Sequence, residues 1–222
     1  MTEIAVDLAY TLGKGTWKRW KLWREEDPVK HLEKTFIPSQ RNQVDVISYT
    51  SETMYYPISN ILEKISDKLS EERGNIHIRL LFRDCTASFL IRGDTPEENL
   101  YNCGVRERAR IEAEKWKELE SICKSHVIVE RRIYRFEPFF KGVLVNSNAG
   151  YFGFYRIDVH EKEISIGKTV RKITAWDYLG KESDMMEISN SGNKQQRQLT
   201  KQFGDIFEKL WQRSELSHPY VT

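Results

Sequence analysis

The sequence predicts an α/β domain with a mixed sheet: a parallel βαβ core, an antiparallel hairpin and helices on both faces. Two patterns support this prediction. Short apolar runs alternate with longer segments whose apolar residues recur with the helical period, which favours parallel strands joined by helices. Later in the chain, apolar runs follow one another across turn residues, which favours antiparallel pairing. With 222 residues and 39% hydrophobic content, the chain has enough apolar material for one core with appendages.

The first βαβ unit is predicted within residues 43–82. Residues 43–49, QVDVISY, form the largely apolar run of a buried parallel strand. Apolar residues then follow the helical period from about residue 57 to residue 73, and Gly74 is a stop signal. Residues 76–82, IHIRLLF, form the second strand, which implies a parallel pair with a right-handed crossover.

A second helix and a third strand continue this pattern. The helix is expected from about residue 105 to residue 124, and the strand follows in HVIVERRIYRF from residue 126. The helix is expected to begin late because the stretch before it contains chain breakers. These breakers are Gly93, Pro96 and Gly104.

The chain then changes to antiparallel strands. FFKGVLVN and YFGFYRIDV flank the turn at residues 147–150 and predict a hairpin. Two further strands, ISIG and VRKITAWDY, are expected at the edge of the sheet, and residues 181–194 are expected to be a polar connection. The final segment has apolar residues on one side of a helix.

Three parts are therefore predicted along the chain. Residues 1–41 form a Trp-rich helical segment, with a helix starting at Asp27-Pro28 and stopped by Pro38. Residues 42–180 form the α/β domain. Residues 181–222 form a linker and a C-terminal amphipathic helix.

The Trp-rich segment allows two interpretations. Its tryptophans recur every third residue, which makes one helical face that packs on the core or on a partner chain. Basic residues lie between them, so the same segment could stack on and neutralise a nucleic-acid strand, with binding that weakens steeply with salt. These basic residues are Lys14, Lys18, Lys21 and Arg24. Large aromatics are favoured anchors at interfaces. The predicted surface for a homodimer or protein partner is Trp17, Trp20, Trp23 and Trp211.

An anion pocket is predicted where the parallel strands end, since ligands bind beyond the carboxyl ends of such strands in open α/β sheets. Hydroxyls follow the first strand, and guanidiniums follow the second and third strands. Planar guanidiniums and a helix N-terminus suit phosphate or carboxylate. The predicted ligand-binding residues are Ser48, Thr50, Ser51, Arg83, Arg131, Arg132 and Arg135. The alternative is that these arginines point to both faces and pair with local acids.

The order of elements resembles half of a phospholipase-D-like fold over roughly residues 42–160. The stretch from GVRERARIEAEKWKELE to VLVNSNAGYFGFYRID is similar to uncharacterised phospholipase-D-like domains attached to bacterial helix-turn-helix regulators. Catalytic members of that superfamily use His-x-Lys-x4-Asp. Where the resemblance places this motif, the chain reads RRIYRFEPFFKGVLVNSNAG, which keeps Lys141 and lacks the histidine nucleophile.

Two enzyme alternatives have partial motifs. His77, Arg79 and Asp84 fit His-x-Arg-x4-Asp on the second strand, as candidate catalytic residues of a divergent phosphodiesterase or nuclease. VDVISYTSET is similar to the first strand of TIR domains, and this resemblance implies NAD cleavage by Glu118 near Trp116.

The composition of the chain limits the classes of protein and of binding site that the sequence allows. The net charge of +2 gives no general support for nucleic-acid binding. No apolar run approaches the roughly 20 residues of a membrane helix, and the first ten residues do not fit a secretory signal. Three scattered cysteines and no metal-ligand spacing predict reduced thiols, a cytoplasmic location and no metal or cofactor.

Because the catalytic motifs are incomplete, the sequence favours a non-catalytic regulatory or ligand-sensing domain. We expect it to bind a small anionic, nucleotide-like ligand and a protein partner. The alternatives are the two enzymes above and a nucleic-acid-binding module.

Overall fold

A computed structural model of the chain describes residues 28–37, 40–49, 52–65, 76–84, 96–123, 126–135, 139–166, 168–179 and 185–216. In chain order, the helices and strands are α2 (Pro28–Glu33), β1 (Asn42–Ser48), α3 (Glu52–Ile65), β2 (Ile76–Arg83), α4 (Pro96–Ile122), β3 (Val127–Tyr134), β4 (Phe140–Val145), β5 (Ala149–Phe154), β6 (Arg156–Ile166), β7 (Thr169–Leu179), β8 (Met186–Ser189), α5 (Lys194–Arg213) and β9 (Glu215–Leu216).

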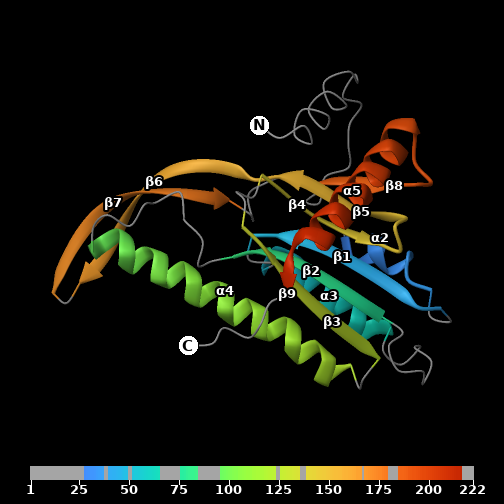
Figure 1. Cartoon of the computed structure of the whole chain (residues 1–222), viewed down its shortest axis with the longest axis horizontal. Coiled ribbons are helices and arrows are strands. Elements are labelled where there is room, and N and C mark those ends of the chain that lie inside the picture. Colours follow the sequence, from blue (N-terminus) through green and yellow to red (C-terminus); the bar gives the residue numbers. More distant parts are fainter. Residues whose placement is uncertain are drawn as a thin grey trace.

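Within the described residues, the main sheet has seven strands in the order β8-β5-β4-β1-β2-β3-β9 (Figure 1). β1, β2 and β3 are parallel, whereas every other pair in this sheet is antiparallel. α3 joins β1 to β2 and α4 joins β2 to β3. The α/β class, the parallel core and the β4–β5 hairpin predicted from the sequence are therefore confirmed.

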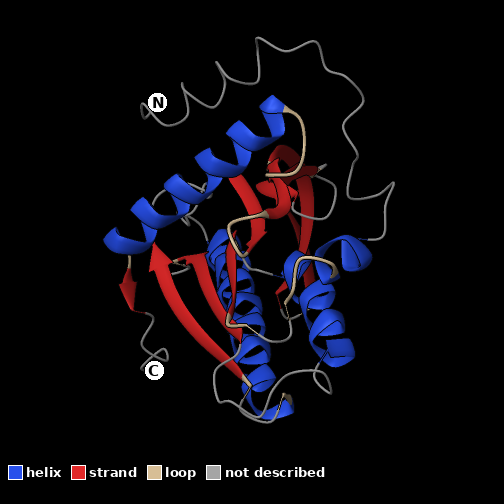
Figure 2. Ribbon diagram, turned by 90° about the vertical axis from the view of Figure 1, so that its right-hand side faces the viewer, coloured by secondary structure: helices blue, strands red, loops and turns tan. Residues whose placement is uncertain are grey.

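The two faces of this sheet carry separate cores, because alternate residues of a strand point to opposite faces. On β1, Val44 and Val46 pack with residues of α2, α3 and α4. The next residue, Ile47, packs with α5. Figure 2 shows helices on both sides of the strands, as the sequence predicts.

The strands β6 and β7 form a separate two-stranded sheet and are not edge strands of the main sheet, so that prediction is wrong. They pair along their full length, from Arg156 opposite Leu179 to Ile166 opposite Thr169, and lie beside α4 (Figure 1). The reason is that β4 and β8 already pair with the two edges of β5. β6 therefore cannot pair with β5, the strand that it directly follows in the chain.

Strand β8 lies inside the segment 181–194, which was expected to be a polar connection. Met186 and Ile188 are buried in the core beneath α5. The apolar signal of β8 is only four residues long and has polar residues after it, so the strand depends on its pairing with β5.

Two helices begin earlier than expected. α3 begins at Glu52 and contains Pro57 inside it. α4 begins at Pro96, where proline is tolerated because the first helical N–H needs no partner within the helix. The helix then runs through Gly104, which is tolerated in a helix interior at a cost of about 1 kcal/mol. The residues interpreted as breakers therefore start and continue the helix.

Candidate functional site

Several polar residues lie at the edge of the sheet where the parallel strands end. β1 ends at Ser48, β2 at Arg83 and β3 at Tyr134. β4 is antiparallel to β1, so its second residue, Lys141, lies at the same edge of the sheet. We refer to these residues and their neighbours as the strand-end cluster. Its members are Ser48, Tyr49, Arg83, Asp84, Tyr134, Arg135, Lys141 and Tyr155.

Three ionisable side chains of the strand-end cluster are almost completely buried. Arg83 and Lys141 are each 1% exposed, and Asp84 is 4% exposed. Taking a charged group out of water costs several kcal/mol, so buried charges are found with fixed polar partners or at binding sites. Arg135 is one such partner, because its Nε lies 3.3 Å from Oδ2 of Asp84. The two buried cations come from β2 and β4, on either side of β1. Strand alternation places Arg83 on the face of Leu81, toward α5, and Lys141 on the face of Val143, toward α3.

Hydroxyl groups join the ends of the strands. The hydroxyl of Tyr134 donates to the backbone oxygen of Ser48 at 3.1 Å. The backbone N–H of Tyr49 donates to the hydroxyl of Tyr155 at 2.6 Å. Burial raises the pKa of Tyr155 far above its usual value, so this hydroxyl stays neutral. The buried Oγ of Ser48 has no hydrogen-bond partner in the described part of the chain.

Aromatic rings lie beside both buried cations. The guanidinium carbon of Arg83 is 5.9 Å from the ring centre of Tyr49, and Nζ of Lys141 is 5.8 Å from that of Tyr155. Both distances are within the range of cation–π attraction. Each buried cation therefore lies beside an aromatic ring at the carboxyl edge of the sheet, and such cations recognise phosphate or carboxylate groups.

The start of α3 adds to this environment. α3 begins at Glu52, four residues after the end of β1. Its N-terminus therefore lies near the carboxyl edge of β1. The unpaired N–H groups and partial positive charge of a helix N-terminus favour an anion there.

Only some of the predicted ligand-binding residues lie at the carboxyl edge of the sheet. Ser48, Arg83 and Arg135 lie at the expected edge, whereas Thr50 and Ser51 lie outside the described residues. β3 continues to Tyr134, so Arg131 and Arg132 lie within the strand, before its end. Neighbouring strand residues point to opposite faces, and the guanidinium of Arg132 contacts α5. Arg132 is therefore corrected from a ligand residue to a packing residue.

The predicted ligand set omits Lys141. Its signal in the sequence is a lone lysine inside the apolar run FFKGVLV. A charge within a strand that is buried along its whole length indicates either a polar partner or a ligand.

The proposed catalytic residues His77, Arg79 and Asp84 do not come together. His77 and Asp84 are seven residues apart on an extended segment, or about 23 Å at 3.3 Å per residue. His77 lies 3.4 Å from Glu130, and Asp84 pairs with Arg135 at the end of the strand. The phosphodiesterase motif read from this strand therefore has no geometric support.

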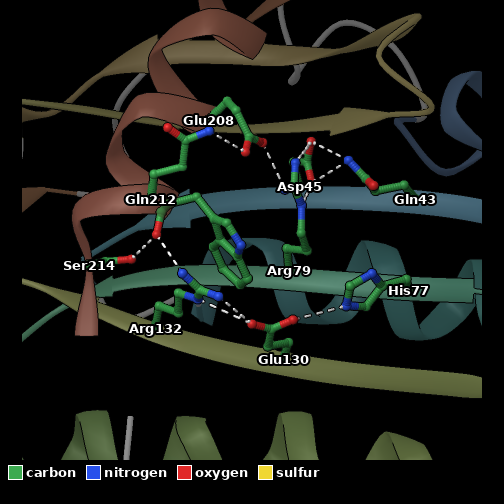
Figure 3. Close-up of polar contacts among 10 residues, drawn as sticks. Gln43, Asp45, His77, Arg79, Glu130, Arg132, Glu208, Gln212 and Ser214 are labelled. Atoms are coloured by element: carbon green, nitrogen blue, oxygen red, sulfur yellow. Dashed lines mark hydrogen bonds and ion pairs between the residues drawn. The ribbon is translucent and has the colours of Figure 1, made fainter. Parts of the chain in front are cut away.

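Arg79 instead holds α5 on the sheet (Figure 3). Its Nε and Nη2 donate to the two carboxylate oxygens of Asp45 at 2.7 and 3.0 Å, and Nη1 donates to Glu208 of α5 at 2.8 Å. The guanidinium also lies 5.0 Å from the ring centre of Phe207 and 5.2 Å from that of Trp211. These contacts link β1, β2 and α5.

Glu130 of β3 connects His77 to Arg132 in the same layer (Figure 3). Arg132 donates to the backbone oxygen of Trp211 at 2.8 Å and lies 4.4 Å from its ring centre. Burial lowers the pKa of His77, although the carboxylate of Glu130 opposes this change. Trp211 is only 5% exposed because it packs inside this network, so it is not available as a partner surface.

The TIR-like pair is also separated. Trp116 is 0% exposed and packs edge-on against Tyr55, whereas Glu118 is exposed. Residues two apart on a helix point in different directions, so these side chains do not share a site.

Several predictions fall on residues that the structure does not describe. Trp17, Trp20 and Trp23 lie outside the described residues, as do the four basic residues between them. Among the described residues, no group of His, Cys, Asp and Glu could hold a metal ion. In that same part of the chain, no helix has the length and apolar character to span a membrane.

Comparison with known proteins gives limited information. No protein-family model matches the sequence, and no curated protein matches it. Among solved structures, the chain is similar to TrmBL2, described as an archaeal chromatin protein with a novel mode of DNA binding, with 10% sequence identity and a TM-score of 0.41. The similarity covers 97% of this chain and 60% of that chain, so this chain spans less than two thirds of TrmBL2. A TM-score at this level assigns neither a fold family nor a function.

Proposed function

We propose that this chain is a non-catalytic ligand-sensing domain that binds a small anion at the strand-end cluster. The observation that carries the proposal is the burial of Arg83 and Lys141 on either side of the end of β1. Both lie where ligands bind in open α/β sheets. The open Oγ of Ser48 and the start of α3 add donors at the same edge.

A phospholipase-D-like fold remains part of this proposal. It is supported by the succession β1, α3, β2, α4 and β3, followed by the β4–β5 hairpin. A non-catalytic role is favoured because the histidine of the superfamily motif is missing before Lys141, and because His77 is engaged with Glu130.

The ligand class follows from the side chains. A guanidinium binds two oxygens of a phosphate or carboxylate in one plane, whereas an ammonium acts as a point charge. Lys141 beside Tyr155, with the hydroxyl of Ser48 on the neighbouring strand, suits a phosphorylated ligand with a planar part, such as a nucleotide.

The test is a thermal-shift screen against inorganic phosphate, nucleotides, NAD, sugar phosphates and phosphodiesters. A ligand at a hundredfold excess over its dissociation constant should stabilise the fold by about 2.7 kcal/mol. Lys141→Met should abolish the shift, because it removes the charge and keeps the shape. Lys115→Met is the matched control, since Lys115 is half-buried and paired with Glu112 on α4.

Each variant is first measured without ligand, so that a loss of folding is separated from a loss of binding. A folded wild-type protein whose midpoint no compound changes would contradict the proposal. A shift that both lysine variants retain would place the anion site elsewhere.

A further inference from the structure

The outward face of α5 is the most basic helical surface in the described part of the chain. α5 contains five cations and two acids, and all five cations are exposed. These cations are Lys194, Arg197, Lys201, Lys209 and Arg213. The whole chain is almost balanced at +2, so this positive charge is local.

None of the five cations forms an ion pair within the described residues. Of the two acids on α5, Glu208 is already bound by Arg79 at 2.8 Å. Asp205 is therefore the one carboxylate of this helix that is left to offset the exposed positive charge. Arg197 donates one hydrogen bond to the backbone oxygen of Gly192, which leaves its charge uncompensated.

Arg213 lies in the last turn of α5, where a cation suits the helix dipole, but helix stability does not explain the cations in the first half of the helix. Lys194 is the first residue of the helix, which has no acidic residue in its first turn. A cation near a helix N-terminus opposes the helix dipole. Arg197 and Lys201 are four residues apart, where like charges destabilise a helix by a few tenths of a kcal/mol. A binding partner of opposite charge accounts for them better.

The helix is held rigidly with this face outward. Phe203, Phe207 and Trp211 pack into the core on the opposite side of α5. A capping box at Asn193 fixes its start, with the side chain of Asn193 accepting from the N–H of Gln196 at 2.9 Å. Arg79 and Arg132 fix its other end to the sheet. The cations are therefore displayed on a fixed support.

We propose that the outward face of α5 docks on the phosphate backbone of double-stranded DNA. From Lys194 to Arg213 the helix spans about 28 Å at 1.5 Å per residue. One turn of B-DNA is about 34 Å long, so the row of cations on α5 is nearly as long as one turn of the duplex. The apolar side of α5 is buried, so the face has nothing to insert into a lipid bilayer, as a membrane-surface helix would. Binding here is independent of the strand-end cluster.

The test uses the full chain and a short DNA duplex of mixed sequence, with affinity measured by fluorescence anisotropy between about 50 and 200 mM salt. Lys201→Gln/Lys209→Gln should reduce the slope of log affinity against log salt by about two, because each lost phosphate contact lowers it by about one. The matched control is Lys117→Gln/Lys168→Gln, which removes the same charge from other exposed positions and should leave the slope unchanged. Both double variants should keep the thermal midpoint of the wild type.

Several outcomes would overturn the proposal. The first is no binding of duplex DNA at the lowest salt. The second is an equal loss in both double variants, which would indicate a general charge effect. The third is a loss caused by Lys14→Gln/Lys18→Gln but not by the α5 variant, which would assign binding to the N-terminal basic residues. The fourth is that vesicles containing phosphatidylserine compete fully with DNA for the same lysines.

Discussion

The two faces of the main sheet are covered in different ways. Under α3 and α4 the packing is almost wholly apolar, with Ile58, Ile61 and Ile78 fully buried. Under α5 the packing is apolar only in part, because Asp45 and Arg79 lie in the layer between the sheet and the helix. Apolar packing holds α3 and α4 on one face of the sheet, whereas α5 on the other face is also held by ion pairs.

The ion pairs of Arg79 affect the position of α5 on the sheet as much as the stability of the fold. Apolar contacts tolerate small shifts of a helix, whereas a guanidinium bound to two carboxylates and two rings permits few alternative positions. Arg79 makes such contacts to Asp45, Glu208, Phe207 and Trp211. We infer that the charged layer fixes where α5 lies. Three predictions test the contrast.

The largest effect is expected from Asp45→Ala. This change leaves Arg79 without its two-oxygen partner in a place where the side chain of Arg79 is only 13% exposed. Breaking a buried pair costs about 3–5 kcal/mol, and the remaining ion pair of Arg79 with Glu208 should place the loss at the lower end of this range. The measurement is the free energy of unfolding in urea.

The control for this prediction is the double variant Asp45→Ala/Arg79→Met. Removing both charges should recover a large part of the stability lost in Asp45→Ala, because no guanidinium is then left buried without its carboxylate. A double variant as unstable as the single one would show that the charged layer does not act as a pair.

On the apolar face, Ile78→Val should have a smaller effect. Ile78 is 0% exposed, and deleting one buried methyl group costs about 0.5–1.5 kcal/mol. The loss should be the same at every pH at which the protein folds, because no charged partner is left behind. A loss that depends on pH would mean that the two faces are coupled.

The fold could be predicted largely from sequence because its core strands have short apolar runs between segments with the helical period. β1, β2 and β4 each show such a run. β8 could not be found in this way, because its four residues become a strand only when β5 offers an edge. The same cause misplaced β6 and β7, since the pairing of strands far apart in sequence has no local signal.

The candidate site could be predicted only in part. The ends of β1 and β2 indicated Ser48 and Arg83, because the carboxyl edge of parallel strands follows from their order. Lys141 was missed because β4 reaches the edge from the opposite direction. Arg132 was misassigned because the exact end of β3 decides which arginine reaches the edge and which meets α5.

The smallest effect is expected from protonation of His77 in the charged layer. Burial lowers its pKa below the usual 6.5, so the unfolded chain takes up this proton first as the pH falls. The contribution of neutral His77 to the free energy of unfolding is therefore complete above about pH 6.5, and it is lost as the pH falls through the lowered pKa. His77→Gln should make the free energy of unfolding less dependent on pH below 6.5, as measured by urea unfolding across a pH series.

Glu130→Gln should have the opposite effect, since the carboxylate of Glu130 favours the protonated ring and removing it lowers the pKa of His77 further. An NMR titration that places the pKa of His77 at or above 6.5 would contradict this account, and would mean that the ion pair with Glu130 outweighs burial.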